Sequence, residues 1–122
     1  MASRSGQCNC GSVAISLKAN PSETVVCHCL NCRRAGGPYS INYVLDDSEV
    51  IIDDLKHSLK EYEDLNTKSG NLVRRNFCQA CGSPVYTKSI TMPGKLLVKA
   101  SLFDEVVVAR ADVFTERKIH WA

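Results

Sequence analysis

The 122-residue sequence has little net charge, few aromatic side chains and no long hydrophobic run. Fifteen lysines and arginines stand against 13 aspartates and glutamates, a net charge of +2, so the polybasic surface typical of nucleic-acid-binding proteins is missing. No apolar stretch approaches the roughly 20 residues that a membrane span needs, and residues 1–10 resemble no secretory signal. We therefore expect no membrane or nucleic-acid partner, and a cytoplasmic location that is also compatible with a nuclear one.

The rest of the composition is that of an ordinary globular chain. Hydrophobic residues make up 44% of the sequence and charged residues 23%. This much apolar surface, with so little net charge, excludes intrinsic disorder. The length suits one hydrophobic core, and no repeat or low-complexity linker divides the chain. We expect a single domain over residues 1–122.

Short apolar segments recur along the whole chain. Residues 13–17 and 39–45 alternate apolar and polar side chains, the pattern of strands with one buried face. A helix has room only at residues 33–35, because the Gly-Gly-Pro run at 36–38 stops it after about one turn. This pattern predicts an all-β protein. The other apolar segments are residues 50–52, 58–62, 72–77, 85–88, 96–98, 106–109 and 113–114.

Seven cysteines in three clusters are the most unusual feature of the sequence. They stand at positions 8 and 10, at 27, 29 and 32, and at 78 and 81. A disulfide framework would favour an even number and an exported chain, and a redox dithiol would explain only the last pair. Thiolates two or three residues apart can converge on one zinc ion, with Zn–S distances of about 2.3 Å. We therefore interpret the clusters as zinc sites.

Spacing alone leaves two partitions of the cysteines open. In the first, the first and last pairs form a closed four-thiolate site, and the middle three keep an open coordination position, which is typical of a reactive zinc ion. In the second, Cys29 and Cys32 join the last pair in one site, and the other three cysteines are spare. Both partitions give thiolate sites of an ordinary kind.

Three segments resemble the glutathione-dependent formaldehyde-activating enzyme family, which also includes centromere protein V. They are Gly6–Val13, with Cys-Asn-Cys-Gly-Ser, Cys27–Gly37, with Cys-His-Cys-Leu-Asn-Cys, and Phe77–Tyr86, with Cys-Gln-Ala-Cys-Gly-Ser. All seven cysteines fall where the family pattern has them. The resemblance runs in order along the chain from Gly6 to Trp121.

The resemblance implies a fold of several coiled antiparallel β-sheets, called a β-tent, stabilised by zinc. It implies two zinc ions per chain, one structural and one catalytic and more labile. The implied reaction is that of a carbon–sulfur lyase, which condenses an aldehyde such as formaldehyde with the thiol of glutathione. The implied ligands are Cys8, Cys10, Cys78 and Cys81 for the structural ion, and Cys27, Cys29 and Cys32 for the catalytic ion.

Two arginines beside the middle cluster are candidates for substrate binding. Arg33 and Arg34 follow Cys32, and either could receive a glutathione carboxylate in a bidentate contact. The alternative is an exposed pair without a role. His28 would point away from its cysteine neighbours in an extended segment, so we expect it beside a zinc site rather than in it.

A binding module is the second functional hypothesis. In this alternative the chain is a non-catalytic, zinc-stabilised module of the centromere protein V type. The two hypotheses differ in metal stoichiometry and in glutathione binding, because only the enzyme needs an accessible second zinc ion. Arg74 and Arg75 receive no role, and those of His120 and Trp121 stay open.

Overall fold

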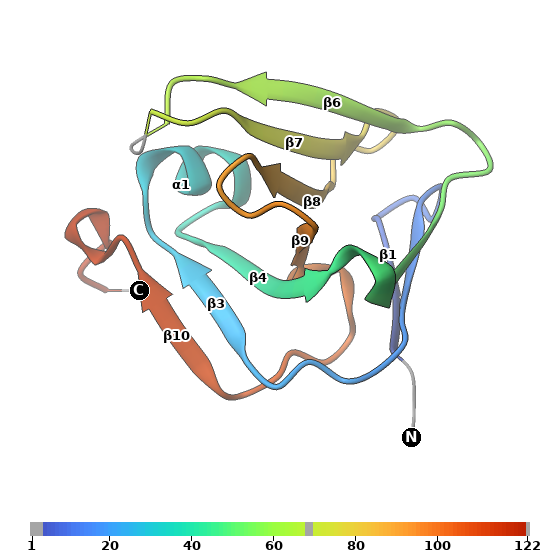
Figure 1. The fold of residues 1–122 in the computed structure, drawn as a ribbon, viewed down its shortest axis with the longest axis horizontal. Coiled ribbons are helices and arrows are strands. Elements are labelled where there is room, and N and C mark those ends of the chain that lie inside the picture. The colour runs from blue at the N-terminus through green and yellow to red at the C-terminus, as the bar shows by residue number, and fades with distance from the viewer. Residues whose placement is uncertain (1–3, 68–69, 122) are drawn as a thin grey trace.

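The computed structural model describes residues 4–67 and 70–121 (Figure 1). Residues 1–3, 68–69 and 122 of the expected domain lie outside the described residues. The strands are β1 (Arg4–Gln7), β2 (Ala14–Leu17), β3 (Thr24–Cys27), β4 (Ser40–Asp46), β5 (Val50–Asp53), β6 (Leu59–Asp64), β7 (Val73–Cys78), β8 (Pro84–Ser89), β9 (Lys95–Lys99) and β10 (Arg110–Val113). The helices are α1 (Leu30–Gly36) and the 3₁₀ helices η1 (Asp47–Glu49), η2 (Ala100–Leu102) and η3 (Thr115–Arg117).

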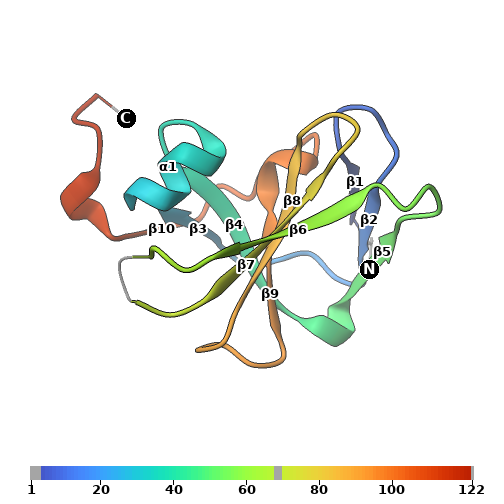
Figure 2. The ribbon, with the colours of Figure 1, turned by 90° about the horizontal axis from the view of Figure 1, so that it is seen from above.

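The strands form two sheets. The small sheet has the order β1-β2-β5, and the large sheet has the order β10-β3-β4-β9-β8-β7-β6. In Figure 1 the large sheet curls, so that β6 and β7 lie across from β3 and β10. Figure 2 shows the small sheet at one end of the molecule and α1 at the other. The predicted all-β class, with coiled and mainly antiparallel sheets, is confirmed; only β10 and β3 pair in parallel among the described strands.

The hydrophobic core joins the small sheet to one face of the large sheet. Ile15 and Leu17 of β2 are 1% exposed, and they share the core with Tyr43 of β4 and Val98 of β9, which are fully buried. Tyr43 and Val98 lie opposite each other in the β4–β9 register. Because successive side chains of a strand point to opposite faces, the same strands present a second set of residues to the other side of the large sheet.

The helix is longer than the sequence predicts. It begins at Leu30 and includes Cys32, because the Cys29 side chain stands at the N-cap, where its sulfur accepts a hydrogen bond from the Cys32 N–H. Gly37, with a φ of 99°, ends the helix, as the glycine run predicts. No helix among the described residues is both long and apolar enough to cross a membrane.

The apolar segment at 106–109 is not a strand. The Val107 N–H donates to the Tyr43 hydroxyl at 3.0 Å, and the Val107 carbonyl accepts from the Thr24 hydroxyl at 2.8 Å. These side-chain contacts occupy the backbone groups that a strand would use in a ladder. The strand forms just afterwards, at Arg110–Val113.

Candidate functional site

The first and last cysteine pairs meet between the β1–β2 turn and the β7–β8 turn. The sulfur of Cys10 lies 3.7 Å from that of Cys8 and 3.7 Å from that of Cys78. With Cys81, the four sulfurs lie within 4.8 Å of one another. Thiolates at the corners of a tetrahedron around zinc are about 3.8 Å apart, so the four-cysteine cluster fits a metal ion of this kind. It also links the two sheets, because the turns belong to different ones.

The two turns of the four-cysteine cluster are built alike. Each contains Cys-Gly-Ser, and the glycine has a φ of 80° in both, a conformation that favours glycine. The serine hydroxyl lies 3.1 Å from the sulfur in the Cys10–Ser12 pair and 3.2 Å in the Cys81–Ser83 pair. These hydroxyls lower the pKa of both thiols, that of Cys81 to about 5. A thiol that ionises readily is ready to bind a metal ion.

The three middle cysteines form a second cluster where β3 ends and α1 begins. The Cys27 and Cys29 sulfurs are 3.5 Å apart, and the three sulfurs lie within 4.8 Å of one another. Hydrogen bonds from Cys27 and Cys32 lower the pKa of the Cys29 thiol, and the bond to Cys29 raises the pKa of Cys27. No histidine or carboxylate among residues 4–67 and 70–121 joins either cluster. The three-cysteine cluster could therefore hold a metal ion and leave one coordination position open.

His28 stands between Cys27 and Cys29 in the sequence. Its side chain is fully buried and contacts β10 rather than the cysteines. Its Nε2 lies 2.6 Å from Oδ2 of Asp112, and its ring packs edge-on against Tyr39. Arg110 donates to both carboxylate oxygens of Asp112, at 2.7 and 2.9 Å. Arg110 and then His28 hold the pKa of Asp112 well below its usual range. The loop that carries the cysteines is thus attached to β10.

The parallel β10–β3 pair brings the C-terminal segment against the three-cysteine cluster. Val113 lies opposite Cys27 in the register, and its carbonyl accepts a hydrogen bond from the His28 N–H at 3.1 Å. Phe114 follows with a φ of 53° and a ψ of 47°. This left-handed conformation is rare for a bulky residue. Val113 and Phe114 both line the cavity described next.

A cavity of about 670 Å³ opens beside the three-cysteine cluster, and all three of its cysteines line it. The floor is the face of the large sheet that points away from the core. Across the strands of this floor, Val44 lies beside Leu97, Leu97 beside Thr87, and Thr87 beside Arg75. The strand pairing therefore builds the floor from single residues on separate strands, and most of it is apolar.

Among residues 4–67 and 70–121, two cations line the cavity, and both have hydrogen-bond partners. The Lys99 ammonium donates to the Ser40 hydroxyl and, at 3.0 Å, to Oδ1 of Asn42. Burial lowers the pKa of Lys99 to about 8. Arg75 Nε donates to Oδ2 of Asp64 at 2.8 Å. No sequence motif points to either cation. Each is a single basic residue on a strand, and only the pairing of that strand with its neighbours shows that the side chain faces the cavity.

Neither Arg33 nor Arg34 lines the cavity. Arg33 donates to the carbonyl oxygen of Arg117 at 3.3 Å. The exposed Arg34 lines a groove of about 270 Å³ together with Arg117. Because Cys29 and Asn31 line both the groove and the cavity, the groove reaches the three-cysteine cluster from the side. The carboxylate contact of these arginines stays a prediction.

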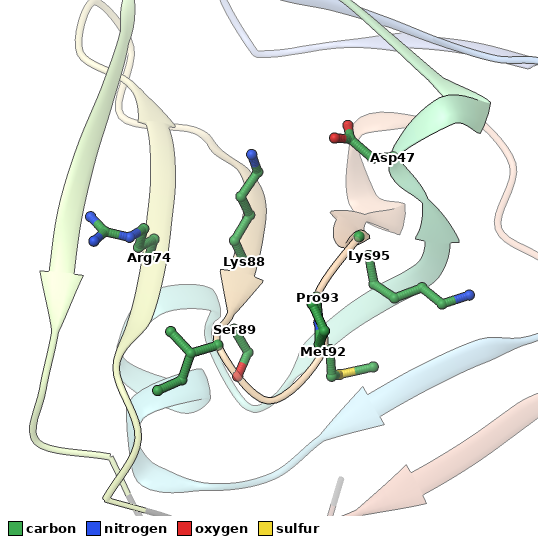
Figure 3. A pocket seen from close by; sticks show the side chains of 9 residues that line it. Asp47, Arg74, Lys88, Ser89, Met92, Pro93 and Lys95 are labelled. Carbon is green, nitrogen blue, oxygen red and sulfur yellow. The ribbon is translucent and has the colours of Figure 1, made fainter.

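A smaller pocket of about 210 Å³ surrounds the turn between β8 and β9. Figure 3 shows Met92 and Pro93 at the bend, with Lys88 and Lys95 nearby. No cysteine lines this pocket, and Lys95 donates to Asp46 at 2.6 Å. Met92 lines both the pocket and the cavity. The β8–β9 turn therefore separates the pocket from the cavity, and the three cysteines lie on the cavity side.

Comparison with known proteins agrees with the cysteine geometry. The family model described as "Glutathione-dependent formaldehyde-activating enzyme" matches residues 3–119. The chain belongs to this family. The resemblance of the three cysteine segments is thus confirmed, and this member of the formaldehyde-activating family has two cysteine clusters that could each hold a metal ion, consistent with zinc.

The fold also occurs in a solved structure. The crystal structure of a protein from Rhodobacter sphaeroides, a structural genomics target, is similar with a TM-score of 0.65 and 23% sequence identity, over 84% of this chain and 89% of that chain. At this identity the likeness shows the fold alone. No curated protein matches the chain.

Proposed function

We propose that this member of the formaldehyde-activating family is a zinc-dependent carbon–sulfur lyase that joins an aldehyde to the thiol of glutathione. One observation carries the proposal: every cysteine of the three-cysteine cluster lines the large cavity, whereas none of the four-cysteine cluster does. The four-cysteine cluster would hold a structural zinc ion, and the three-cysteine cluster a catalytic and more labile one. A zinc ion with an open position would help the incoming thiol to ionise.

The reaction makes one C–S bond and needs no oxidant. An electron pair on the thiol sulfur attacks the carbonyl carbon, and the π pair of the carbonyl moves to its oxygen. The thiol gives up a proton, and the new hydroxyl takes one up. Lys99 and Arg75, which line the cavity together with the cysteines, place positive charge where negative charge develops on the oxygen. The reverse reaction breaks the same C–S bond.

The groove beside the cavity suits the polar thiol. Glutathione carries two carboxylates, and Arg34 and Arg117 line the groove. A guanidinium binds a carboxylate through two parallel hydrogen bonds. Because Cys29 lines both groove and cavity, a thiol held there by a carboxylate can reach the three-cysteine cluster. Arg33 would support the groove through its bond to the Arg117 carbonyl.

Two measurements on the zinc-loaded protein test the proposal. Isothermal titration should detect glutathione binding, and exchange NMR should show faster formation of S-(hydroxymethyl)glutathione than in buffer. Arg34→Gln should weaken glutathione binding about tenfold, as expected for one lost charge-assisted hydrogen bond, without changing the zinc content. Lys18→Gln, at an exposed position just after β2, is the matched control. A two-zinc protein that neither binds glutathione nor accelerates the reaction would favour the binding module.

A further inference from the structure

We infer that the cavity accepts the hydrocarbon chain of a medium-chain aldehyde, so that the carbonyl substrate of this protein is larger and more apolar than formaldehyde. The inference rests on the proposed function, because it names the carbonyl partner of that reaction. Three observations carry it: the size of the cavity, the chemistry of its lining, and the place of its charged groups.

The cavity is far larger than formaldehyde. Its volume is about 670 Å³, within the roughly 300–1,000 Å³ that small-molecule sites have. A water molecule takes up about 30 Å³ of liquid, and formaldehyde has only one more heavy atom than water. Formaldehyde alone would therefore leave most of the cavity to water. A longer aldehyde could fill it from the three-cysteine cluster outward.

The floor of the cavity is apolar surface that the fold leaves uncovered. Val25, Val44, Val73 and Leu97 line it from β3, β4, β7 and β9, and each is only half-buried. Neighbours on the core face of β4 and β9, such as Tyr43 and Val98, are fully buried. Covering apolar surface of this kind with a hydrocarbon chain is favourable, because it removes that surface from water.

The apolar surface continues up to the reacting position. Val113 and Phe114 line the cavity and are 37% and 45% exposed. Val113 lies opposite Cys27, and Phe114 has the left-handed φ of 53°. Unfavourable backbone conformations of this kind gather at ligand sites. An aldehyde whose carbonyl lies at the three-cysteine cluster would thus contact apolar side chains along its length.

The positions of the charged groups favour the aldehyde in the cavity and glutathione in the groove. Lys99 is held by Ser40 and Asn42, and Arg75 by Asp64. In the proposed reaction both cations serve the carbonyl end of a substrate, and among residues 4–67 and 70–121 no further cation lines the cavity for a carboxylate. The groove supplies other cations, from Arg34 and Arg117. The polar thiol fits the groove, and the apolar chain fits the cavity.

Binding of alcohols tests the cavity without any reaction. 1-Propanol and 1-hexanol keep the hydrocarbon chain but lack the carbonyl, and NMR titration of the zinc-loaded protein measures their affinities. Affinity should rise about fourfold for each added methylene, with shifts in the methyl signals of Val44 and Leu97. Equal affinity for the two alcohols, or shifts elsewhere, would overturn the inference.

Matched variants locate the site. Leu97→Asn, which keeps the branched shape of the side chain, should weaken 1-hexanol binding at least tenfold. Leu55→Asn, at a position that is 83% exposed and outside the cavity, should leave it unchanged. Val44→Thr is a milder version in the same floor, in case Leu97→Asn does not fold. Unchanged 1-hexanol binding in a folded Leu97→Asn or Val44→Thr variant would contradict the inference.

Reaction with glutathione separates this inference from the proposed function. Exchange NMR compares hexanal with formaldehyde, each as acceleration over its own uncatalysed reaction, and we expect at least a tenfold larger acceleration for hexanal. Acceleration with formaldehyde but not with hexanal would overturn the inference and leave the proposed function standing. Acceleration with neither aldehyde would overturn both, even if 1-hexanol binds.

Discussion

Gly6 lies where β1 passes close to the end of η2. A Cβ atom at this position would stand 2.5 Å from the carbonyl oxygen of Leu102 and 2.9 Å from the Phe103 ring. Neither contact is possible without a shift, and one of the two neighbours is backbone. The absence of a side chain at residue 6 therefore allows the small sheet to pack against the segment after β9.

We expect Gly6→Ala to lower the free energy of unfolding by about 1–3 kcal/mol, the usual cost of overpacking. Gly36→Ala is the control, because its Cβ would lie 3.7 Å from Ser40, an ordinary contact, and alanine favours a helix by up to about 1 kcal/mol. Urea unfolding of both zinc-loaded variants checks the pair. Equal stability of Gly6→Ala and the unchanged protein would show that the β1 packing yields easily.

Single residues also show where sequence reasoning stops. The cysteines could be predicted, because thiols two or three residues apart share a chemistry that their spacing reveals. Lys99 and Arg75 could not. Each is one basic residue among several on the strands, and its position in the cavity depends on pairing with distant segments. Arg33 and Arg34 attract notice by their place next to Cys32, yet they lie outside the cavity.

At the scale of elements, the parallel β3–β10 pair positions the three-cysteine cluster. β10 lies more than 80 residues after β3 and pairs with its outer edge. The short apolar segments near the C-terminus predict strands but carry no sign of direction or partner, and one of them, 106–109, is irregular. The sequence could therefore predict the strand class but not this pairing, which brings Asp112 to His28.

Asp112→Asn should lower the zinc affinity of the three-cysteine cluster about tenfold, as loss of a partner behind the ligands does. The change weakens the bond to His28, whose neighbours Cys27 and Cys29 would be ligands. Competition with a coloured chelator measures the affinity, with the exposed Asp104→Asn as control. The affinity of the four-cysteine cluster should not change. An equal loss at both clusters would point to a general destabilisation of the fold.

The depressed pKa of Asp112 also predicts how its contribution to stability depends on pH. Because the folded-state pKa of Asp112 is depressed, its contribution to stability is fully present above its ordinary pKa of about 4 and is lost as the pH falls through the depressed value. Asp112→Asn removes this contribution. The stability difference between the two proteins, from urea unfolding, should therefore be constant near neutral pH and shrink only in acid. A difference that shrank near pH 7 would contradict this assignment.

For the whole molecule, the four-cysteine cluster is the joint between the two sheets. It takes Cys8 and Cys10 from the small sheet's turn and Cys78 and Cys81 from the large sheet's turn. A structural zinc ion contributes an apparent ~10–16 kcal/mol, as much as the whole ~5–15 kcal/mol stability of a typical domain. Loss of a zinc ion held by the four-cysteine cluster should therefore unfold the protein, whereas loss of an ion held by the three-cysteine cluster should not.

We expect a chelator to act in two stages. Mild chelation should remove the ion of the three-cysteine cluster and end activity while circular dichroism stays unchanged, and stronger chelation should then unfold the chain. Cys29→Ser should likewise give a folded, inactive protein with one zinc ion, and Cys81→Ser an unfolded one. Native mass spectrometry counts the ions. Equal folding of the two variants would mean that the clusters do not differ in this way.

Features of the whole molecule could be predicted where they depend on residues close together in the sequence. The all-β class follows from recurring short apolar segments, and the cysteine clusters follow from spacing together with the family pattern. The cavity does not, because it is bounded by residues of β3, β4, β7, β8, β9 and β10 that meet only after the large sheet curls.

The four-cysteine cluster, which links the two sheets, shares no residue with the lining of the cavity. Substitutions at Val44, Leu97 or Phe114 can therefore alter which molecules fit the cavity without weakening the four-cysteine cluster. Such a layout lends itself to diversification: laboratory evolution that randomises the lining while keeping the seven thiols would explore new carbonyl compounds on a scaffold that still folds.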